Sequence, residues 1–128
     1  MHPLTEAYLY AASRAQLLHT VVRPALDRGA IVISDRSVLS SLAYQGGAQG
    51  VSIEDILSLN ELALRGSEAD IIFGLSVDID TALSRTFDTA GDKFESYGRE
   101  FFERVVSAYE KVSQMPIFAN NWQNIDAS

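Results

Sequence analysis

The sequence has no cysteine, which excludes disulfide bonds and thiolate metal sites and favours the reducing cytoplasm as its location. It has no apolar run near the roughly 18 residues needed to span a bilayer. Basic residues are few, 10 against 17 acidic ones, and the net charge of −7 argues against a broad nucleic-acid-binding surface. We therefore expect a cytoplasmic protein that binds neither membranes nor nucleic acid. A small anionic ligand is compatible with this charge, because it needs only a few cations focused in a cleft.

The phosphate-binding motif G-x-x-x-x-G-K-[ST] is also absent, as are G-x-S-x-G and H-E-x-x-H. The two histidines are isolated and support no metal site. What is present is the composition of a globular chain of 128 residues, 47% of them hydrophobic and 21% charged. Because this is the length of one ordinary domain, we expect residues 1–128 to form a single domain.

Hydrophobic spacing predicts the secondary structure. Helical periodicity is found over residues 4–28, 52–64, 80–85 and 99–114. Apolar and β-branched runs predict strands over residues 30–34, 70–78 and 122–128, the first two of them buried. In the first helix, Thr5 is the expected cap, Pro24 should cause a kink or restart, and Gly29 should end the helix. Strands that alternate with helices indicate an α/β fold with a parallel sheet.

Charged residues stand where the predicted strands end. Asp35 and Arg36 follow the first strand, Asp78 ends the second, and Asp126 lies near the end of the third. Parallel sheets bind ligands at the carboxyl ends of their strands, which favours a functional interpretation of these residues. The alternative for Asp35 and Arg36 is a plain surface ion pair, worth only about 0–1 kcal/mol.

Two further clusters have the chemistry to recognise a nucleotide. Tyr10 and Arg14 are four residues apart, so on a helix they share one face, where they could stack a base and grip a phosphate. The alternative is a core-edge tyrosine beside a solvated arginine. The amide of Gln45, next to Tyr44 and two glycines, could read a base edge or could form the polar tip of a turn.

The order of these segments is more specific than any one of them. The chain carries, from about Leu4 to Ser128, YAASRAQ, RPAL, SDRS, SSLAYQGG, a strand ending in VD, DKFE and a final IDAS. This series resembles bacterial thymidylate kinase, and DR followed by SSLAYQG is its most specific part. The resemblance implies an incomplete P-loop NTPase-type three-layer fold, with a parallel sheet and helices on both faces. It also implies phosphoryl transfer from ATP, as its Mg²⁺ complex, to dTMP, giving dTDP for dTTP biosynthesis.

The resemblance assigns roles to individual residues. Tyr10 takes the place of the aromatic residue, usually phenylalanine, that stacks on thymine. Arg14 matches the arginine near the thymine and the substrate phosphate, and Arg36 matches the arginine that grips the monophosphate for in-line attack. Asp35 matches the acid that helps to arrange the Mg²⁺ shell. The residues expected around the base and sugar are Ser41, Tyr44 and Gln45.

A lid is implied over about residues 86–98, with Arg85 at its mouth and Lys93 inside it as candidate catalytic cations. Family members commonly have arginines here, and lysine supplies charge without the bidentate fork. The resemblance also places three residues near the expected adenine loop: Asp126, Ala127 and Ser128. The ATP-binding residues themselves stay unassigned, because the phosphate-loop motif is missing.

The chain departs from the family pattern at both ends. Family members begin with a strand, a phosphate loop and a helix before the residues matched by Leu4, and they continue with a helix after IDAS. The missing strand would lie between the strands at Ile31 and Ile71, so we expect a sheet with a gap or an unpaired edge. We expect such a fragment to have essentially no kinase activity alone and to aggregate or self-associate, whereas full-length members are usually homodimers.

Two other interpretations stay open. A deoxynucleoside kinase relative would also carry an acid or base followed by arginine after a strand, although SSLAYQGG argues against it. A non-catalytic remnant of a kinase would bind a nucleotide or a partner chain without transferring phosphate. Nucleotide preference separates the first interpretation from dTMP kinase. For the second, the discriminator is the upstream reading frame, since a phosphate-loop sequence encoded directly before Met1 would argue against a remnant.

Overall fold

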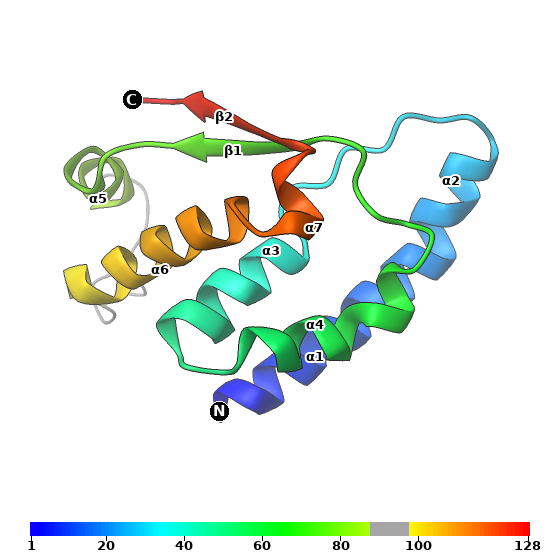
Figure 1. Ribbon diagram of the computed structural model, residues 1–128, viewed down its shortest axis with the longest axis horizontal. Coiled ribbons are helices and arrows are strands. Elements are labelled where there is room, and N and C mark those ends of the chain that lie inside the picture. The colour runs from blue at the N-terminus through cyan, green and yellow to red at the C-terminus, as the bar shows by residue number, and fades with distance from the viewer. Residues whose placement is uncertain (88–97) are drawn as a thin grey trace. The chain divides into compact units, whose positions relative to one another are not determined.

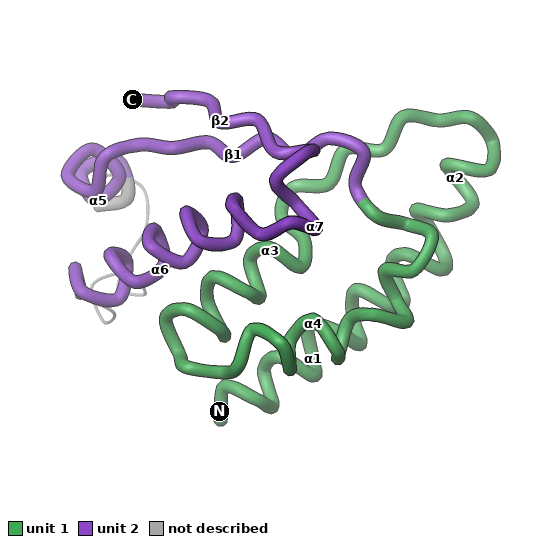
Figure 2. Tube along the Cα trace, in the orientation of Figure 1, with its two compact units in different colours: residues 1–68 green, residues 69–128 purple. Residues whose placement is uncertain are grey.

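The computed structural model describes residues 1–87 and 98–128. The chain divides into two compact units, Met1–Glu68 and Ala69–Ser128, which we call unit 1 and unit 2 (Figure 2). Unit 1 is helical, whereas unit 2 holds the sheet (Figure 1). That residues 1–128 form one domain stays a prediction.

Unit 1 begins with a long helical stretch. It comprises α1 (Pro3–Leu17), the π-helical segment η1 (Leu18–Val22) and α2 (Arg23–Asp27). Pro24 has no backbone N–H to donate, and the helix takes π spacing just before it and restarts as α2, as the sequence predicts. Gly29, with a φ of 81°, ends the stretch in the left-handed conformation that glycine adopts without strain.

The start of α1 differs from its prediction. His2, not Thr5, caps the helix, because Nδ1 of His2 accepts a hydrogen bond from the backbone N–H of Leu4. Pro3 explains the shift. Its fixed φ suits the first helical turn, where its missing N–H would have no partner in any case, so the helix begins before Thr5.

The rest of unit 1 packs against α1. It consists of α3 (Val38–Ser41), the π-helical segment η2 (Leu42–Ala48) and α4 (Ile53–Leu64). The hydroxyl of Ser52 caps α4 by accepting a hydrogen bond from the Asp55 N–H at 3.4 Å, as predicted. In Figure 1, α4 runs alongside α1, with which it packs. The buried apolar residues of unit 1 are Ala7, Ala11, Leu18, Val38, Leu42, Ala43, Ile56 and Ala63.

The prediction of a buried strand over residues 30–34 is wrong. These residues are not in a strand, and Ile31 and Ile33 are 92% and 91% exposed. A strand needs a neighbouring strand for its backbone hydrogen bonds, and within residues 1–87 and 98–128 none pairs with this segment. The β-branched run therefore has strand propensity without a pairing partner.

Unit 2 contains two parallel strands, β1 (Ile72–Ser76) and β2 (Trp122–Asp126), with Gly74 opposite Asn124. Figure 1 shows the two arrows side by side and pointing the same way. Both strands and their parallel direction match the sequence prediction. In the described part of the chain the sheet has only these strands and does not include residues 30–34, so the predicted incomplete sheet is confirmed.

Helices α5 (Ile79–Phe87), α6 (Gly98–Ser113) and the short α7 (Pro116–Ala119) complete unit 2. The first two match predicted helices, whereas α7 was not predicted. The ends of the expected lid, Thr86 and Gly98, belong to α5 and α6, and residues 88–97 lie outside the described part. Helix α6 buries one face, formed by Phe101, Val105, Ala108 and Val112.

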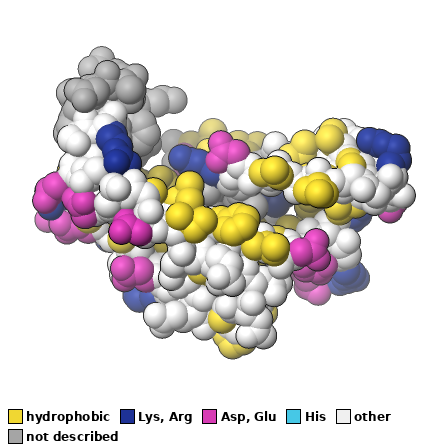
Figure 3. All heavy atoms as spheres, turned by 90° about the horizontal axis from the view of Figure 1, so that it is seen from above, with side chains coloured by type: hydrophobic (Ala, Val, Ile, Leu, Met, Phe, Trp, Pro, Cys, Tyr) yellow, Lys and Arg dark blue, Asp and Glu magenta, His cyan; other side chains and the backbone are white. Residues whose placement is uncertain are grey.

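Strand β1 is less buried than predicted. Phe73 and Leu75 point to the exposed side of the strand, although the apolar run predicts cover on both faces. Apolar side chains reach the surface in several patches, which are yellow in the space-filling view (Figure 3). A parallel strand is covered only where helices or further strands pack on it, and the described residues leave Phe73 and Leu75 62% and 71% exposed.

No helix within residues 1–87 and 98–128 combines the length and the apolar character needed to cross a membrane.

Candidate functional site

Arg14 is the centre of the polar cluster in unit 1. Its Nη2 donates a hydrogen bond to Oγ of Ser41 at 3.0 Å, and its Nη1 donates to Oδ1 of Asn60. The three residues come from α1, α3 and α4, so the packing of these helices positions the guanidinium group. Ser41 and Asn60 are buried, and the Arg14 side chain is half-buried between them.

Both of these partners of Arg14 are neutral. Within residues 1–87 and 98–128 no carboxylate lies at ion-pair distance from Arg14, because the ion pairs there involve Arg65 and Arg99. Burial lowers the pKa of Arg14 from its ordinary value, because partial loss of water disfavours the charged form. A half-buried cation without a counter-ion is a natural place for an anionic or oxygen-rich ligand.

Arg36 lies in a strained turn in front of α3. Its backbone adopts a φ of 67°, a conformation that residues with a side chain rarely take. The hydroxyl of Ser34 donates a hydrogen bond to the Arg36 carbonyl at 2.7 Å and helps to hold the turn. The Arg36 guanidinium lies 5.7 Å from the centre of the Tyr44 ring, which is a cation–π contact. The structure thus brings together two predicted site residues, Arg36 and Tyr44, and the exposed Asp35 precedes Arg36 in sequence.

A pocket of about 340 Å³ opens at the N-terminal part of α1. It is lined by Met1, Glu6, Leu9, Tyr10 and Ser13. Tyr10 is exposed there, so its ring is accessible to a planar ligand. Gln45, another predicted site residue, is buried, and its Nε2 donates a hydrogen bond to Oε2 of Glu6 at 3.4 Å. Because Glu6 lines the pocket, this bond connects Gln45 to the pocket wall.

The remaining predicted site residues belong to unit 2. Arg85 donates a hydrogen bond from Nη1 to the carbonyl of Ala127 at 3.0 Å, so the lid-mouth cation and the expected adenine segment meet. Asp126 accepts a hydrogen bond from the backbone N–H of Ser128 at 2.9 Å, which lowers the pKa of Asp126. Lys93 lies outside the described residues.

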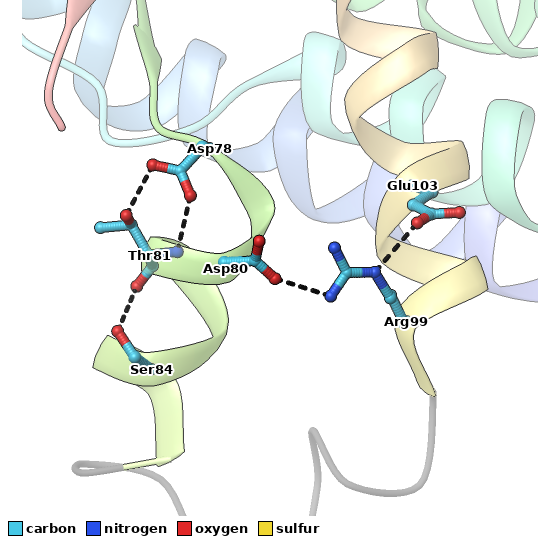
Figure 4. A network of polar contacts seen from close by, with 6 residues as sticks. All are labelled: Asp78, Asp80, Thr81, Ser84, Arg99 and Glu103. Atoms are coloured by element: carbon cyan, nitrogen blue, oxygen red, sulfur yellow. Dashed lines mark hydrogen bonds and ion pairs between the residues drawn. The ribbon is translucent and has the colours of Figure 1, made fainter.

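Unit 2 also contains a second polar network, shown in Figure 4. Asp78 accepts hydrogen bonds from the Thr81 N–H at 2.9 Å and from its hydroxyl at 2.6 Å, and the hydroxyl bond is the main cause of a lowered Asp78 pKa. Arg99 joins Asp80 of α5 at 2.8 Å and Glu103 of α6 at 3.1 Å. Arg99 is exposed and forms ion pairs with one carboxylate of α5 and one of α6. These ion pairs link the two helices.

Sequence reasoning missed Asn60 and Glu6. Asn60 is 1% exposed and lies on the face of α4 that also buries Ile56 and Ala63. The signal was available, because an amide at a helical position between apolar residues at 56 and 63 must find buried partners. Glu6 lies four residues before Tyr10, so both share one face of α1.

Comparison with known proteins assigns the family. A family model described as thymidylate kinase matches residues 1–128. The chain belongs to the thymidylate kinase family. It is 44% identical to the thymidylate kinase of Finegoldia magna over 110 residues, which cover 84% of this chain and 54% of that protein. It is 43% identical to the thymidylate kinase of Halalkalibacterium halodurans over 119 residues, covering 85% and 57% of the two chains.

The fold comparison agrees with this family. The crystal structure of thymidylate kinase from Ehrlichia chaffeensis matches with a TM-score of 0.76 and 26% identity, over 100% of this chain and 58% of that one. The resemblance to thymidylate kinase and the predicted P-loop NTPase-type α/β fold are therefore confirmed. The chain spans about half the length of the curated relatives it matches.

Proposed function

We propose that this chain carries the dTMP-binding part of an enzyme that transfers the γ-phosphoryl group of ATP to dTMP. Membership of the thymidylate kinase family supports this proposal. The structural observation that carries it is Arg14, a half-buried cation held by two neutral partners beside an exposed tyrosine. A nucleoside monophosphate supplies what such a site lacks, because it combines a planar base with an anionic group.

In this proposal different residues of unit 1 contact the base, the sugar and the phosphate of dTMP. Tyr10 stacks on the thymine ring, and the Gln45 amide contacts its edge at a position held by Glu6. Arg36 grips the monophosphate, since a guanidinium binds two phosphate oxygens at once and keeps its proton. The family resemblance puts Tyr44 and Ser41 around the sugar and base, and the two residues contact Arg36 and Arg14 respectively.

Phosphoryl transfer asks the protein mainly for positioning and charge neutralisation. When bound with ATP, Mg²⁺ would supply part of the neutralisation, and this ion is usually held by one or two carboxylates together with phosphate oxygens. Asp35 fits this limited role, because it is an exposed carboxylate next to Arg36. Within residues 1–87 and 98–128 no three acidic or histidine side chains form a metal cluster. Mg²⁺ usually completes its shell with substrate phosphates and several waters, so a single carboxylate is compatible with the proposed role. Arg85 and Lys93 are the proposed cations for the transferring group.

We also propose that the 128 residues alone transfer no phosphoryl group at a measurable rate. Their sequence contains no G-x-x-x-x-G-K-[ST] motif, whose backbone N–H groups and lysine hold the ATP phosphates. A homodimer and a cytoplasmic location stay predictions. Formation of dTDP from ATP and dTMP by the isolated chain would contradict the proposed inactivity, and sedimentation of the same sample reports its oligomeric state.

The binding proposal is tested by titrating dTMP into the ¹⁵N-labelled chain and following chemical shifts. We expect saturable shifts in unit 1, and a dissociation constant for dAMP that is about tenfold higher or more, because a pyrimidine site rejects the larger purine. Loss of stacking in Tyr10→Ala should weaken dTMP binding by about fivefold to 100-fold. Tyr8→Ala is the matched control, since Tyr8 is also exposed on α1 but does not line the pocket.

Two results would contradict the proposal. Absence of saturable shifts with dTMP would leave a remnant that binds a partner chain instead. Thymidine binding as tightly as dTMP would favour the deoxynucleoside kinase interpretation, because the phosphate would then contribute nothing.

A further inference from the structure

We propose that Asn60 is a positioning residue for nucleotide binding, which holds the Arg14 guanidinium with a neutral oxygen and so leaves its charge available to dTMP. The inference rests on the proposed function and adds a residue that the family resemblance does not assign. Asn60 acts through Arg14 and need not touch the nucleotide itself. Its role depends on three features: a fixed amide orientation, neutrality and burial.

The orientation of the Asn60 amide follows from its two partners. Nδ2 donates a hydrogen bond to the Ile56 carbonyl at 2.8 Å, one turn earlier in α4, and Oδ1 accepts from Nη1 of Arg14. A carbonyl can only accept and a guanidinium can only donate, so the reverse orientation would lose both bonds. The backbone of α4 therefore fixes the direction in which the Asn60 oxygen points. Through its hydrogen bond to Arg14, this oxygen helps to position the guanidinium group.

Neutrality is the second feature. Ser41 and Asn60 satisfy N–H groups on both terminal nitrogens of Arg14 without cancelling its charge, whereas a carboxylate at either position would form an ion pair with it. The arginine keeps further N–H groups, including its Nε–H, for another acceptor. An arginine paired with acids, as Arg99 is with Asp80 and Glu103, offers less net charge to a ligand.

Burial is the third feature. Asn60 is 1% exposed, so water does not compete for its oxygen and its geometry depends on helix packing. The competing explanation is purely structural: Asn60 satisfies buried polar groups and stabilises the α1–α4 contact without affecting ligand binding. The two explanations differ in one measurable respect. Only a residue that acts through Arg14 loses its effect on binding once Arg14 is replaced.

A double-mutant cycle measures this coupling with dTMP as the probe. The chains are wild type, Asn60→Leu, Arg14→Met and the double variant, because leucine and methionine keep side-chain size while removing the polar groups. We expect Asn60→Leu to weaken dTMP binding by about fivefold or more in the wild-type chain and by less than about twofold in the Arg14→Met chain. Equal losses in both backgrounds would assign Asn60 to stability and overturn the proposal.

Asn60→Asp provides a second measurement. It keeps the Oδ1 acceptor and adds a negative charge, and it also replaces the Nδ2 donor to the Ile56 carbonyl with an oxygen. We expect the aspartate to pair with Arg14 and weaken dTMP binding by about fivefold or more, again only where Arg14 is present. Ser58→Asp is the matched control, since it adds the same charge at an exposed position of α4, and it should change the affinity by less than about twofold.

The remaining outcomes also decide the question. If far-UV circular dichroism shows that neither Asn60 variant folds, Asn60 is a stability residue and the positioning role is rejected. If the wild-type chain shows no saturable dTMP binding, the proposed function fails, and the inference fails with it. Wild-type binding with an additive cycle rejects the positioning role alone.

Discussion

Arg14 of unit 1 and Arg99 of unit 2 differ in burial and in the charge of their hydrogen-bond partners. Arg99 is exposed and bound to two carboxylates, and the hydrogen bond to Asp80 is the main cause that raises its pKa. Arg14 is half-buried and bound to an amide and a hydroxyl, and burial lowers its pKa. Arg99 has carboxylate partners within its own unit, whereas Arg14 has neutral hydrogen-bond partners and no carboxylate at ion-pair distance in the described part of the chain.

This difference separates a structural cation, Arg99, from the cation that we propose to bind a ligand, Arg14. An exposed ion pair contributes little to stability, but it links two helices without any ligand. A half-buried cation without an anion is costly to maintain in a protein, so it is expected where a ligand supplies the missing charge. The comparison therefore supports the proposal that unit 1 is the part that binds dTMP.

The largest expected effect tests the two arginines directly. Arg14→Met should weaken dTMP binding by about tenfold or more, because hydrogen bonds to a charged group are lost. Arg99→Met, the same substitution in unit 2, should change the affinity by less than about twofold. Isothermal titration calorimetry or shift titration measures both. An equal loss in the two variants would remove the distinction between the arginines.

The second prediction compares the cost in stability of adding a Cβ at a glycine in each unit, Gly74 in unit 2 and Gly46 in unit 1. A Cβ on Gly74 would lie 2.7 Å from the indole ring of Trp122, whose Nε1 donates a hydrogen bond to Asn124. Gly74→Ala should therefore lower the free energy of unfolding by about 1–3 kcal/mol, as overpacking does. At Gly46 the nearest atom is the end of the Ile56 side chain, at 3.3 Å, so Gly46→Ala should cost less than about 1 kcal/mol.

Urea unfolding of both alanine variants measures these costs. The cause is checked in the Trp122→Leu background, where the smaller side chain leaves room and Gly74→Ala should become nearly neutral. A cost that persists there would mean that Gly74 is required for another reason, such as the backbone geometry of β1.

The smallest expected effect is a change in how stability depends on pH under acidic conditions. Because the Asp78 pKa is lowered by Thr81, the ionised carboxylate stabilises the folded state above the ordinary value of about 3.9, and this contribution is lost as pH falls through the lowered pKa. Asp78→Asn should therefore lose less stability than wild type on acidification below that value. Thermal melts of both chains over this pH range measure the difference, and parallel profiles would show that the Asp78 carboxylate contributes nothing.

Much of the fold could be predicted because its causes are local. Ser52 caps α4, Gly29 ends the first helical stretch and Pro24 interrupts it, each through the chemistry of one or two residues. The strands β1 and β2 and the amphipathic α6 also follow from hydrophobic spacing. The predictions that failed depend on contacts between distant parts of the chain. Residues 30–34 have strand propensity, but they form a strand only if another strand pairs with them.

The candidate site shows the same division. Tyr10, Arg14, Arg36 and Gln45 could be selected from residue type and order along the chain. Their partners could not, because Asn60 is 46 residues from Arg14 and Glu6 is 39 residues from Gln45. No spacing rule connects residues so far apart until the helices that carry them pack together.

The sequence by itself thus determined the family, the local helix boundaries and the chemical types available for nucleotide binding. Tertiary structure decided the electrostatic state of those groups. Among the described residues Arg14 has no acidic partner, because α1, α3 and α4 pack so that a hydroxyl and an amide reach its guanidinium group. Charge balance depends on which side chains meet in space and how much water they lose, and neither quantity is encoded in a local stretch of residues.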